Sequence, residues 1–403
     1  MQIVHLSTDI GGGAGIAALR LHRALLQAGL QSKIITKYGN VTDDTHHVIG
    51  ATTLVNKVAE KLGFLPNWKI QKAETLKKKP PGFEIFSLPY GTIDLSKHPW
   101  IQQADIIHLH WVSDGYINLE TLFQLPKQFV WTLHDMNPFT GGCHHADGCL
   151  QFENDCSKCP QLHIKQQYLA ADAFLFKQKV LKYVGNKLQI IAPSKWLLQL
   201  SVQSKLFSDF RHTQIYNLIA QQFSYKPLID SRNKLNLPPN ETVVLFVAND
   251  VNNMRKGIQF IIEAANKSKH KFYGIGKPDA NLPSCINQLG YLTPEELQWW
   301  YVAANVFVLP SLAENFPNTI CESLCCGTPV VAFNTGGIPE LIDNNNGVLI
   351  PDFNATQLLM AIDNCIANNQ HFNRKQIASD ADKKLSSTTV LQMHITLYQS
   401  VLC

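Results

Sequence analysis

Apolar residues recur along this chain with two different periods, and the two periods alternate. Short runs of Val, Ile, Leu and Phe return at intervals, and the stretches between them repeat an apolar residue every three or four positions. The runs are typical of strands buried in a parallel sheet, and the stretches between them are typical of covering helices. The predicted strands of the first half are residues 2–6, 32–36, 106–109, 129–133 and 188–192, and its first predicted helix is residues 16–28.

The second half repeats the pattern. Its predicted strands are residues 242–248, 270–274, 306–309, 330–332 and 347–350. Residues 224–238 are polar and interrupted by two prolines, which favours a linker. A chain of 403 residues is also too long for one ordinary core. The sequence therefore predicts two doubly wound Rossmann-like α/β domains, over residues 1–223 and 236–380, and a last helix at 381–403 that packs back on the first domain.

Composition favours a soluble cytoplasmic protein. The formal net charge is only +4, so we expect no nucleic-acid partner. The first residues lack the cationic stretch and apolar segment of a secretion signal, and no run of about 18 apolar residues could span a membrane. Six of the ten cysteines are scattered through apolar sequence, as expected of reduced thiols packed in a core.

A glycine-rich turn, GGGAG at residues 11–15, follows the first predicted strand and precedes a helix. Gly12 and Gly13 in such a turn let main-chain N–H groups approach a phosphate, which the helix dipole also favours. The alternative is a tight turn without a ligand. A nicotinamide site would need an acidic residue after the second strand, where this chain has Thr36, Lys37 and Tyr38, so we reject that interpretation.

The densest chemical signal is the segment PSLAENFPNTICES at residues 310–323. Glu314 follows a strand, Asn318 or Thr319 could cap a helix, and Glu322 lies in its first turns. Carboxylates beside free helix amides suit a ligand with many hydroxyls, such as a sugar or a ribose. The alternative is two surface acids at a helix start.

At this point the sequence resembles a known family. Glu314 and Glu322, with seven residues between them, look like the paired glutamates of family 4 retaining glycosyltransferases of the GT-B fold, and the flanking GTPVVA at 327–332 and GGIPELI at 336–342 match that family as well. The resemblance implies two Rossmann-like domains facing a central cleft. It also implies a nucleotide-sugar donor, retention at the anomeric carbon and no metal required for catalysis.

Strand-end residues of the first half extend the resemblance. The run WTLHD at 131–135 places His134 where open α/β folds bind ligands, and the matching histidine of the family contacts the donor sugar. Without the family, a lone histidine at a strand end is more often a hydrogen-bonded structural residue. His110 and Trp111 end a neighbouring strand and are candidates for the acceptor side, with packing at the domain edge as the alternative.

The donor diphosphate requires cations. Lys256 matches the family lysine that pairs with it, and Arg255 adjoins it, although Asn249 and Asp250 stand where the family usually has an arginine. A solvated pair of basic residues is the alternative. By resemblance the donor would contact Gly12, Gly13, Arg255, Lys256, Glu314, Phe316, Pro317, Asn318, Thr319 and Glu322, with His134 and Glu314 as catalytic residues.

Four cysteines form a separate cluster just after His134. Cys143, Cys149, Cys156 and Cys159 lie in a polar loop where core packing does not explain them. In a reducing cytoplasm four thiolates suit a structural zinc ion, with His144 or His145 as substitutes for a cysteine. Two disulfides or four free thiols are the alternatives. A zinc-dependent nucleic-acid module is disfavoured by the acids among the cysteines, which are Asp147, Glu153 and Asp155.

A lysine-rich stretch between residues 41 and 103 has one apolar helical face. Such a stretch could rest on an anionic membrane surface, or it could be a solvated face over an ordinary contact. The sequence thus predicts a retaining glycosyltransferase that acts on a glycan or lipid-linked acceptor, in the cytoplasm or at the inner face of a membrane, in synthesis of a bacterial surface polysaccharide. A nucleotide-sugar epimerase or a sugar phosphorylase on the same fold is the alternative.

Overall fold

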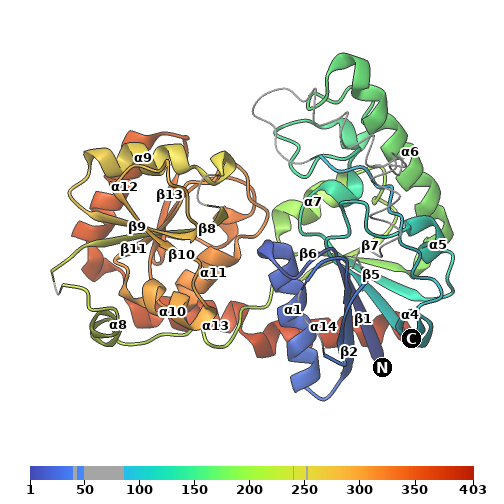
Figure 1. The fold of residues 1–403 in the computed structure, drawn as a ribbon, viewed down its shortest axis with the longest axis horizontal. Coiled ribbons are helices and arrows are strands. Elements are labelled where there is room, and N and C mark those ends of the chain that lie inside the picture. The colour runs from blue at the N-terminus through green and yellow to red at the C-terminus, as the bar shows by residue number, and fades with distance from the viewer. Residues whose placement is uncertain (40–42, 50–85, 239, 251–252) are drawn as a thin grey trace. The chain divides into compact units, whose positions relative to one another are not determined.

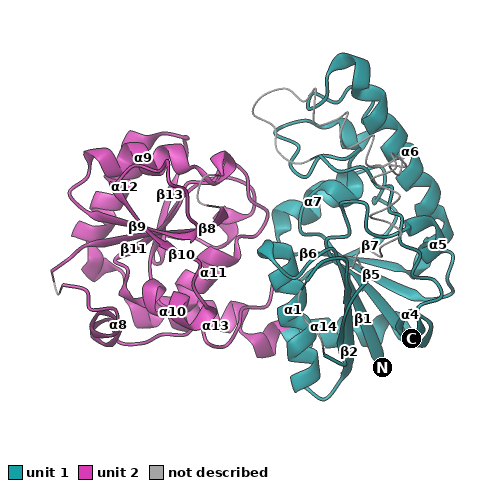
Figure 2. Ribbon diagram, in the orientation of Figure 1, with its two compact units in different colours: residues 1–215, 391–403 teal, residues 216–390 magenta. Residues whose placement is uncertain are grey.

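The computed structural model describes residues 1–403 apart from 40–42, 50–85, 239 and 251–252. It divides into two compact units (Figure 2). Unit 1 comprises residues 1–215 and 391–403, and unit 2 comprises residues 216–390. The chain therefore enters unit 2 once and returns to unit 1 within its last helix, α14 (Ser387–Leu402).

Unit 1 is built on a seven-stranded parallel sheet with the order β3-β2-β1-β4-β5-β6-β7 (Figure 1). Its strands are β1 (Gln2–Ser7), β2 (Gln31–Thr36), β3 (His46–Val48), β4 (Ile106–Leu109), β5 (Gln128–Thr132), β6 (Leu188–Ala192) and β7 (Arg211–Gln214). Within the described residues its helices of four residues or more are α1 (Gly12–Gln27), α4 (Pro99–Gln103), α5 (Leu119–Phe123), α6 (Gln167–Val184), α7 (Lys195–Gln203) and most of α14. The order reverses between β1 and β4, where an open sheet of this kind binds ligands at the carboxyl ends of its strands.

Unit 2 repeats the plan with a six-stranded parallel sheet in the order β10-β9-β8-β11-β12-β13. Its strands are β8 (Val243–Asp250), β9 (Lys271–Lys277), β10 (Ile286–Gly290), β11 (Val306–Leu309), β12 (Val330–Phe333) and β13 (Gly347–Ile350). Its helices are α8 (Leu228–Lys234), α9 (Ile258–Lys267), α10 (Pro294–Ala303), α11 (Asn318–Cys325), α12 (Ala355–Ala367) and α13 (Arg374–Leu385). Its order reverses between β8 and β11.

The predicted fold class, two doubly wound Rossmann-like α/β domains, is confirmed. Each of the ten apolar runs that predict a strand coincides with one, because the strands are buried and are continuous apolar sequence. In β4, β11 and β12 every residue is buried. The first helix begins at Gly12, one turn earlier than predicted. Three strands escape prediction: β3, β7 and β10.

The predicted linker at residues 224–238 is different in the structure. It contains α8, which packs on α10 within unit 2. Arg232 of α8 is buried and donates hydrogen bonds to the main-chain oxygen of Glu241 at 2.8 Å and to the Asn305 side chain at 2.7 Å. A buried guanidinium needs acceptors of this kind, and they fix the segment to unit 2.

The apolar stretch at residues 54–65 and its neighbouring lysines lie outside the described residues. Among the helices that the structure does describe, none has the length and apolar character needed to cross a membrane.

Candidate active site

In unit 2, Glu314 lies on the connection that follows β11, at the carboxyl edge of the sheet. Two glycines hold this connection closely. Gly257 and Gly336 have positive φ angles of 79° and 56°, and a Cβ atom on either would come within 2 Å of a main-chain oxygen, of Pro310 or Glu314 respectively. Only glycine tolerates both the φ angle and the close approach, so these positions set the place of the Glu314 backbone.

Glu314 is buried, and its carboxylate is surrounded by positive charge. Its Oε1 accepts a hydrogen bond from Lys256 Nζ and lies 3.6 Å from Arg255 Nη1. Arg255 also donates to the main-chain oxygen of Ala313 at 2.7 Å. Burial alone would raise the pKa of Glu314, but Lys256 and Arg255 outweigh it and lower that pKa to about 2. The structure therefore brings together three predicted site residues around one ionised carboxylate.

Glu322 lies in α11, the helix that follows the connection carrying Glu314. Its side chain is buried, and its Oε2 accepts a hydrogen bond from Tyr301 Oη at 3.1 Å. The predicted cap of this helix is wrong: Pro317 occupies the N-cap position without a side-chain hydrogen bond, and Asn318 and Thr319 are already helical. Pro317 therefore gives the helix no side-chain cap, and a helix N-terminus without such a cap suits an anionic ligand oxygen.

An aromatic pair frames the start of α11. Phe316 is buried and stacks on Tyr216, with ring centroids 5.0 Å apart and an angle of 16° between the planes. The Asn318 side chain accepts a hydrogen bond from Asn217 at 3.0 Å. Asn217 and Tyr216 are contacts that the sequence did not reveal, because no motif around them marks them as partners of residues a hundred positions later.

In unit 1 the glycine-rich turn connects β1 to α1. Gly12 has a φ angle of 64°, and a Cβ atom there would meet no atom within 4 Å, so the backbone at Gly12 lies beside open space. Gly15 differs, since a Cβ atom would come within 2.6 Å of the Asp9 main-chain oxygen. The first turn of α1 carries no acidic residue that would compete with an anion. This geometry is compatible with the predicted phosphate contact at Gly12 and Gly13.

His134 follows β5 and ends a chain of three hydrogen-bonded imidazoles. Its Nε2 lies 3.1 Å from His110 Nδ1, and His110 Nε2 lies 3.0 Å from His5 Nδ1. His134 is partly buried, whereas His110 and His5 are 3% and 0% exposed. Burial lowers the pKa of His134 to about 4, so its ring is neutral at pH 7. His110 has both ring nitrogens engaged behind His134, and this placement favours the packing alternative for His110 over the acceptor side.

Trp111 belongs to a second network beside His134. Its Nε1 donates to Asp135 Oδ2 at 2.9 Å, and His144 Nδ1 lies 2.6 Å from the same oxygen. Burial would raise the pKa of Asp135, but His144 and the N–H group of Asn137 outweigh it and lower that pKa. Asp135 and His144 were missed as site residues. His144 Nε2 in turn lies 2.9 Å from Ser87 Oγ, so the indole is held by a fixed carboxylate.

The predicted residues thus form one group in each unit. Arg255, Lys256, Glu314 and the start of α11 lie at the carboxyl edge of the unit 2 sheet; Gly12, Gly13, His134 and Trp111 lie at the corresponding edge in unit 1. Both groups adjoin the point where the strand order reverses, as expected of ligand-binding residues in doubly wound folds.

Comparison with known proteins gives this architecture a class. The model of the family described as Glycosyl transferases group 1 matches residues 241–368, within unit 2. Over 375 residues the chain is 24% identical to WcaC of Escherichia coli strain K12, a glycosyl transferase named for colanic acid biosynthesis; the match covers 87% of this chain and 86% of WcaC.

Two solved structures share the fold over the whole length. Sucrose-phosphate synthase from Thermosynechococcus elongatus has a TM-score of 0.68 at 20% identity, covering 100% of this chain and 99% of its own. HepE from Anabaena, solved in complex with UDP-glucose, has a TM-score of 0.60 at 16% identity, covering 99% and 100%. The chain is therefore a transferase enzyme, a glycosyltransferase with the GT-B fold. Its unit 2 carries the group 1 glycosyltransferase match.

Proposed function

We propose that this glycosyltransferase is a retaining enzyme that moves a sugar from a nucleotide-sugar donor to a glycan or lipid-linked acceptor, in synthesis of a bacterial surface polysaccharide. The observation that carries the proposal is the buried, ionised carboxylate of Glu314 beside Lys256 and Arg255, next to the uncapped start of α11. Cations, a carboxylate and helix amides together suit a ligand that combines phosphates with hydroxyls. The names of WcaC and of the HepE complex support the same substrate classes.

In this proposal Lys256 and Arg255 neutralise the donor diphosphate, together with the N–H groups at Gly12 and Gly13. Glu314 accepts hydrogen bonds from sugar hydroxyls, and Glu322 accepts them from the ribose. The main chain from Phe316 through Pro317 and Asn318 to Thr319 donates to the donor, and His134 contacts the sugar near the reacting carbon. Trp111 takes the acceptor side, supported by the fixed carboxylate of Asp135.

Departure of the nucleotide diphosphate leaves negative charge, which the enzyme must stabilise. Lys256 already has one anionic partner in Glu314, so a bound diphosphate adds a second anion to a cation held in place beforehand. Preorganised charges of this kind stabilise a transition state without a metal ion. We accordingly propose that catalysis requires no metal, and that the enzyme acts in the cytoplasm with peripheral contact to the membrane where the acceptor is lipid-linked.

A donor screen followed by a transfer assay tests the proposal. The intact chain is heated with single nucleotide sugars, since a ligand raises the unfolding temperature in proportion to its occupancy. The stabilising donor, labelled in its sugar, is then incubated with glycan and lipid-linked acceptors. We expect label in the acceptor and the same anomeric configuration in donor and first product by NMR. An isomerised sugar would identify an epimerase, and sugar release dependent on inorganic phosphate would identify a phosphorylase.

A further inference from the structure

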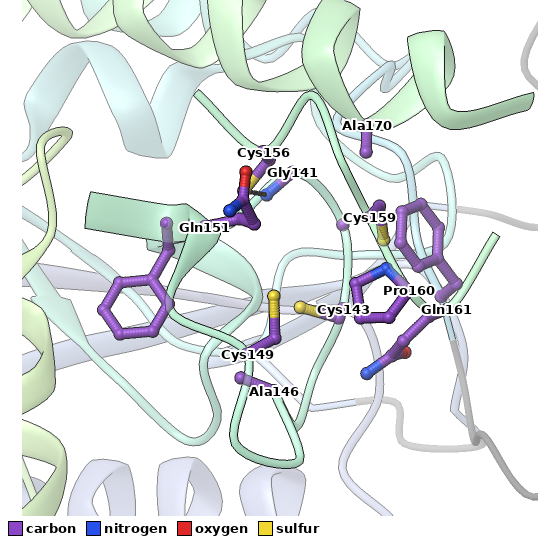
Figure 3. Close-up of a pocket in the computed structure, with 13 residues that line it drawn as sticks. Gly141, Cys143, Ala146, Cys149, Gln151, Cys156, Cys159, Pro160, Gln161 and Ala170 are labelled. Carbon is purple, nitrogen blue, oxygen red and sulfur yellow. Dashed lines mark hydrogen bonds between the residues drawn. The ribbon is translucent and has the colours of Figure 1, made fainter. Parts of the chain in front are cut away.

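The loop between β5 and α6 carries a cluster of thiols that the proposed transfer reaction does not use. This loop has little regular structure, because its only helical turns in the described chain before α6 are three short 3-10 turns, Asn137–Phe139, Gln151–Glu153 and Ile164–Gln166. A long connection without secondary structure is uncommon in a compact domain and is usually held by another interaction. Four cysteines of this loop line a single pocket, which Figure 3 shows: Cys143, Cys149, Cys156 and Cys159.

The four thiols are mostly shielded from solvent. Cys143, Cys156 and Cys159 are each less than 10% exposed, Cys149 is partly buried, and none is in a disulfide. The remaining lining includes Phe86 and Phe152, so the pocket is apolar apart from its sulfurs and two glutamines, Gln151 and Gln161. Four cysteines around one pocket match the number of protein ligands that a structural zinc ion takes.

A buried ammonium group lies beside these thiols without a carboxylate partner. Lys177 of α6 is 3% exposed, and its Nζ donates to the main-chain oxygens of Asn137 and Thr140, the latter at 2.9 Å. Among the described residues no carboxylate forms an ion pair with it, and the groups whose negative charge would act on it are the thiols of Cys156 and Cys143 and then the carboxylate of Asp135. A buried cation without a counter-charge is costly. Thiolates at the cysteine positions would supply that charge.

The backbone around the cluster is arranged for a sulfur ligand. The N–H group of Gly141 donates to Cys156 Sγ at 3.1 Å, an interaction that strengthens when the sulfur is a thiolate. Cys156 itself has a φ angle of 55°, a conformation that costs of order 1 kcal/mol for a residue with a Cβ atom. It begins the sequence Cys-Ser-Lys-Cys at 156–159, the short spacing that lets two cysteines ligate one metal ion.

We propose that Cys143, Cys149, Cys156 and Cys159 bind one structural zinc ion, and that Lys177 and the Gly141 N–H group balance the negative charge of the four thiolates. Zinc and four thiolates carry a net charge of about −2, and a buried cation with an N–H···S bond offsets part of it. No three of these sulfurs, all of which are described, lie within 4.8 Å of one another. Zinc, with bonds to sulfur of about 2.3 Å, would therefore draw the loop inward.

The other concentration of metal-binding groups in the described chain has most of its ring nitrogens in hydrogen bonds, with His5 Nε2 as the exception. His5, His108 and His110 bring ring nitrogens within 4.8 Å of one another. However, His108 contacts Tyr398 Oη at 2.7 Å and Thr132 Oγ1 at 2.8 Å, while His5 and His110 bond to each other. A metal ion there would break an existing network, whereas zinc at the cysteines would complete one.

The loop would connect the zinc ion to the candidate active site. His144 follows Cys143 directly and holds Asp135, and the main-chain oxygen of His144 accepts a hydrogen bond from Met136 at 3.0 Å. The four protein ligands leave no open position for substrate, so the ion would organise this loop and take no part in chemistry. The zinc proposal does not depend on which sugar is transferred.

Metal analysis of the intact chain, purified without chelator, tests the proposal. We expect about one equivalent of zinc, released in step with four thiols when a mercurial reagent is titrated into the native protein. Cobalt in place of zinc should give the intense visible absorption of a tetrahedral tetrathiolate site. C149S should lose the metal, while C285S, a partly buried cysteine of unit 2, should keep it.

The titration of the native chain decides the question even where a cysteine variant does not fold. Less than about a tenth of an equivalent of zinc with four freely titrating thiols would overturn the proposal. Two disulfides would overturn it too. They would leave these four cysteines without alkyl groups, by mass spectrometry, after alkylation of the denatured, unreduced chain. Iron with inorganic sulfide in place of zinc would assign the thiols to a different cofactor.

Discussion

At the scale of single residues, the Glu314 carboxylate decides the behaviour of the candidate site. It is buried and ionised because Lys256 and Arg255 offset its desolvation. E314Q keeps the shape of the side chain but removes the charge that sugar hydroxyls would donate to. We expect the turnover number to fall by about 10²-fold or more, as for other lost transition-state contacts. Initial rates with a saturating donor measure it.

The same substitution removes the negative charge beside Lys256 and Arg255, so stability must be measured together with activity. Removing one partner of a buried ion pair costs about 3–5 kcal/mol. Bound nucleotide should restore part of that loss, because its diphosphate replaces the missing anion. E263Q, on the exposed side of α9, is the matched control and should change neither quantity. Near-normal turnover in folded E314Q would remove Glu314 from the mechanism.

Lys256 offers a second test at this scale. K256A should weaken nucleotide binding about 10- to 100-fold, since charge-assisted hydrogen bonds are worth about 1.5–3 kcal/mol. The structure disfavours the alternative of a solvated basic pair, because Lys256 pairs with the buried Glu314, so some destabilisation is expected as well. Calorimetric titration with the nucleoside diphosphate measures the affinity. K267A, from the exposed pair with Glu263, is the control, and equal affinities in both variants would place the phosphate site elsewhere.

The sequence identifies Glu314 and Lys256 individually but not their contact. The motif around each residue marks it as functional, yet an ion pair across 58 positions depends on β8 and β11 being neighbours in the sheet. For the same reason Tyr301, which donates to Glu322, and His5, which lies behind His110, could not be predicted. Neither residue carries a local motif; each acquires its role from strand and helix packing.

At the scale of elements, burial decides what the sequence reveals. The ten predicted strands are recognisable because they are apolar on both faces. β7 has the sequence RHTQ with no buried residue, and β3 has three residues, so neither carries an apolar signal. Both are edge strands with one neighbour each: β7 pairs with β6, and β3 pairs with β2. Edge strands of this kind are fixed by the neighbouring strand and not by their own periodicity.

The connection that carries Glu314 gives a prediction at this scale. G336A adds a Cβ atom that would lie 1.7 Å from the Glu314 main-chain oxygen, at a φ angle of 56°. The connection must move, so we expect loss of transfer activity and destabilisation greater than the ~1 kcal/mol expected for the φ angle alone. Urea unfolding and initial rates measure the two effects.

The control for this substitution is G290A. Gly290 also has a positive φ angle, 73°, but a Cβ atom there would meet no atom within 4 Å. It should therefore show only the cost of the backbone conformation and should keep its activity. Equal losses of stability in both variants would mean that the close approach at Gly336 does not position Glu314.

At the scale of the whole molecule, the most unusual feature is the histidine content of the unit 1 core. Six imidazoles from β1, β4, α1, α14 and the end of β5 share this region: His5, His22, His108, His110, His134 and His394. Burial is the largest cause of a lowered pKa at each of them. Composition alone could not reveal this, because 15 histidines in 403 residues could equally have been exposed.

These lowered pKa values make unit 1 sensitive to mild acid. In the unfolded chain each ring binds a proton near pH 6.5, whereas the pKa is about 4 for His22 and about 3 for His394 in the folded state. Between those values the unfolded chain binds more protons, so stability is complete above about pH 6.5 and falls as the pH is lowered. Each ring contributes a slope of about 1.4 kcal/mol per pH unit. Glu314, with a pKa lowered from 4.5 to about 2, loses its contribution only in a more acidic window.

We therefore expect the urea concentration at the midpoint of unfolding of unit 1 to fall steeply between pH 6.5 and pH 5. The fluorescence of the tryptophans in unit 1 monitors this unfolding. H394L should reduce that slope by about one proton, because His394 is 4% exposed and its Nδ1 has no hydrogen-bond partner among the described residues. Replacing the exposed His371 of unit 2 with leucine should leave the slope unchanged. A midpoint that stays constant from pH 7.5 to pH 5 would show that these rings are protonated in the folded chain without cost, and that the core opens to water around them.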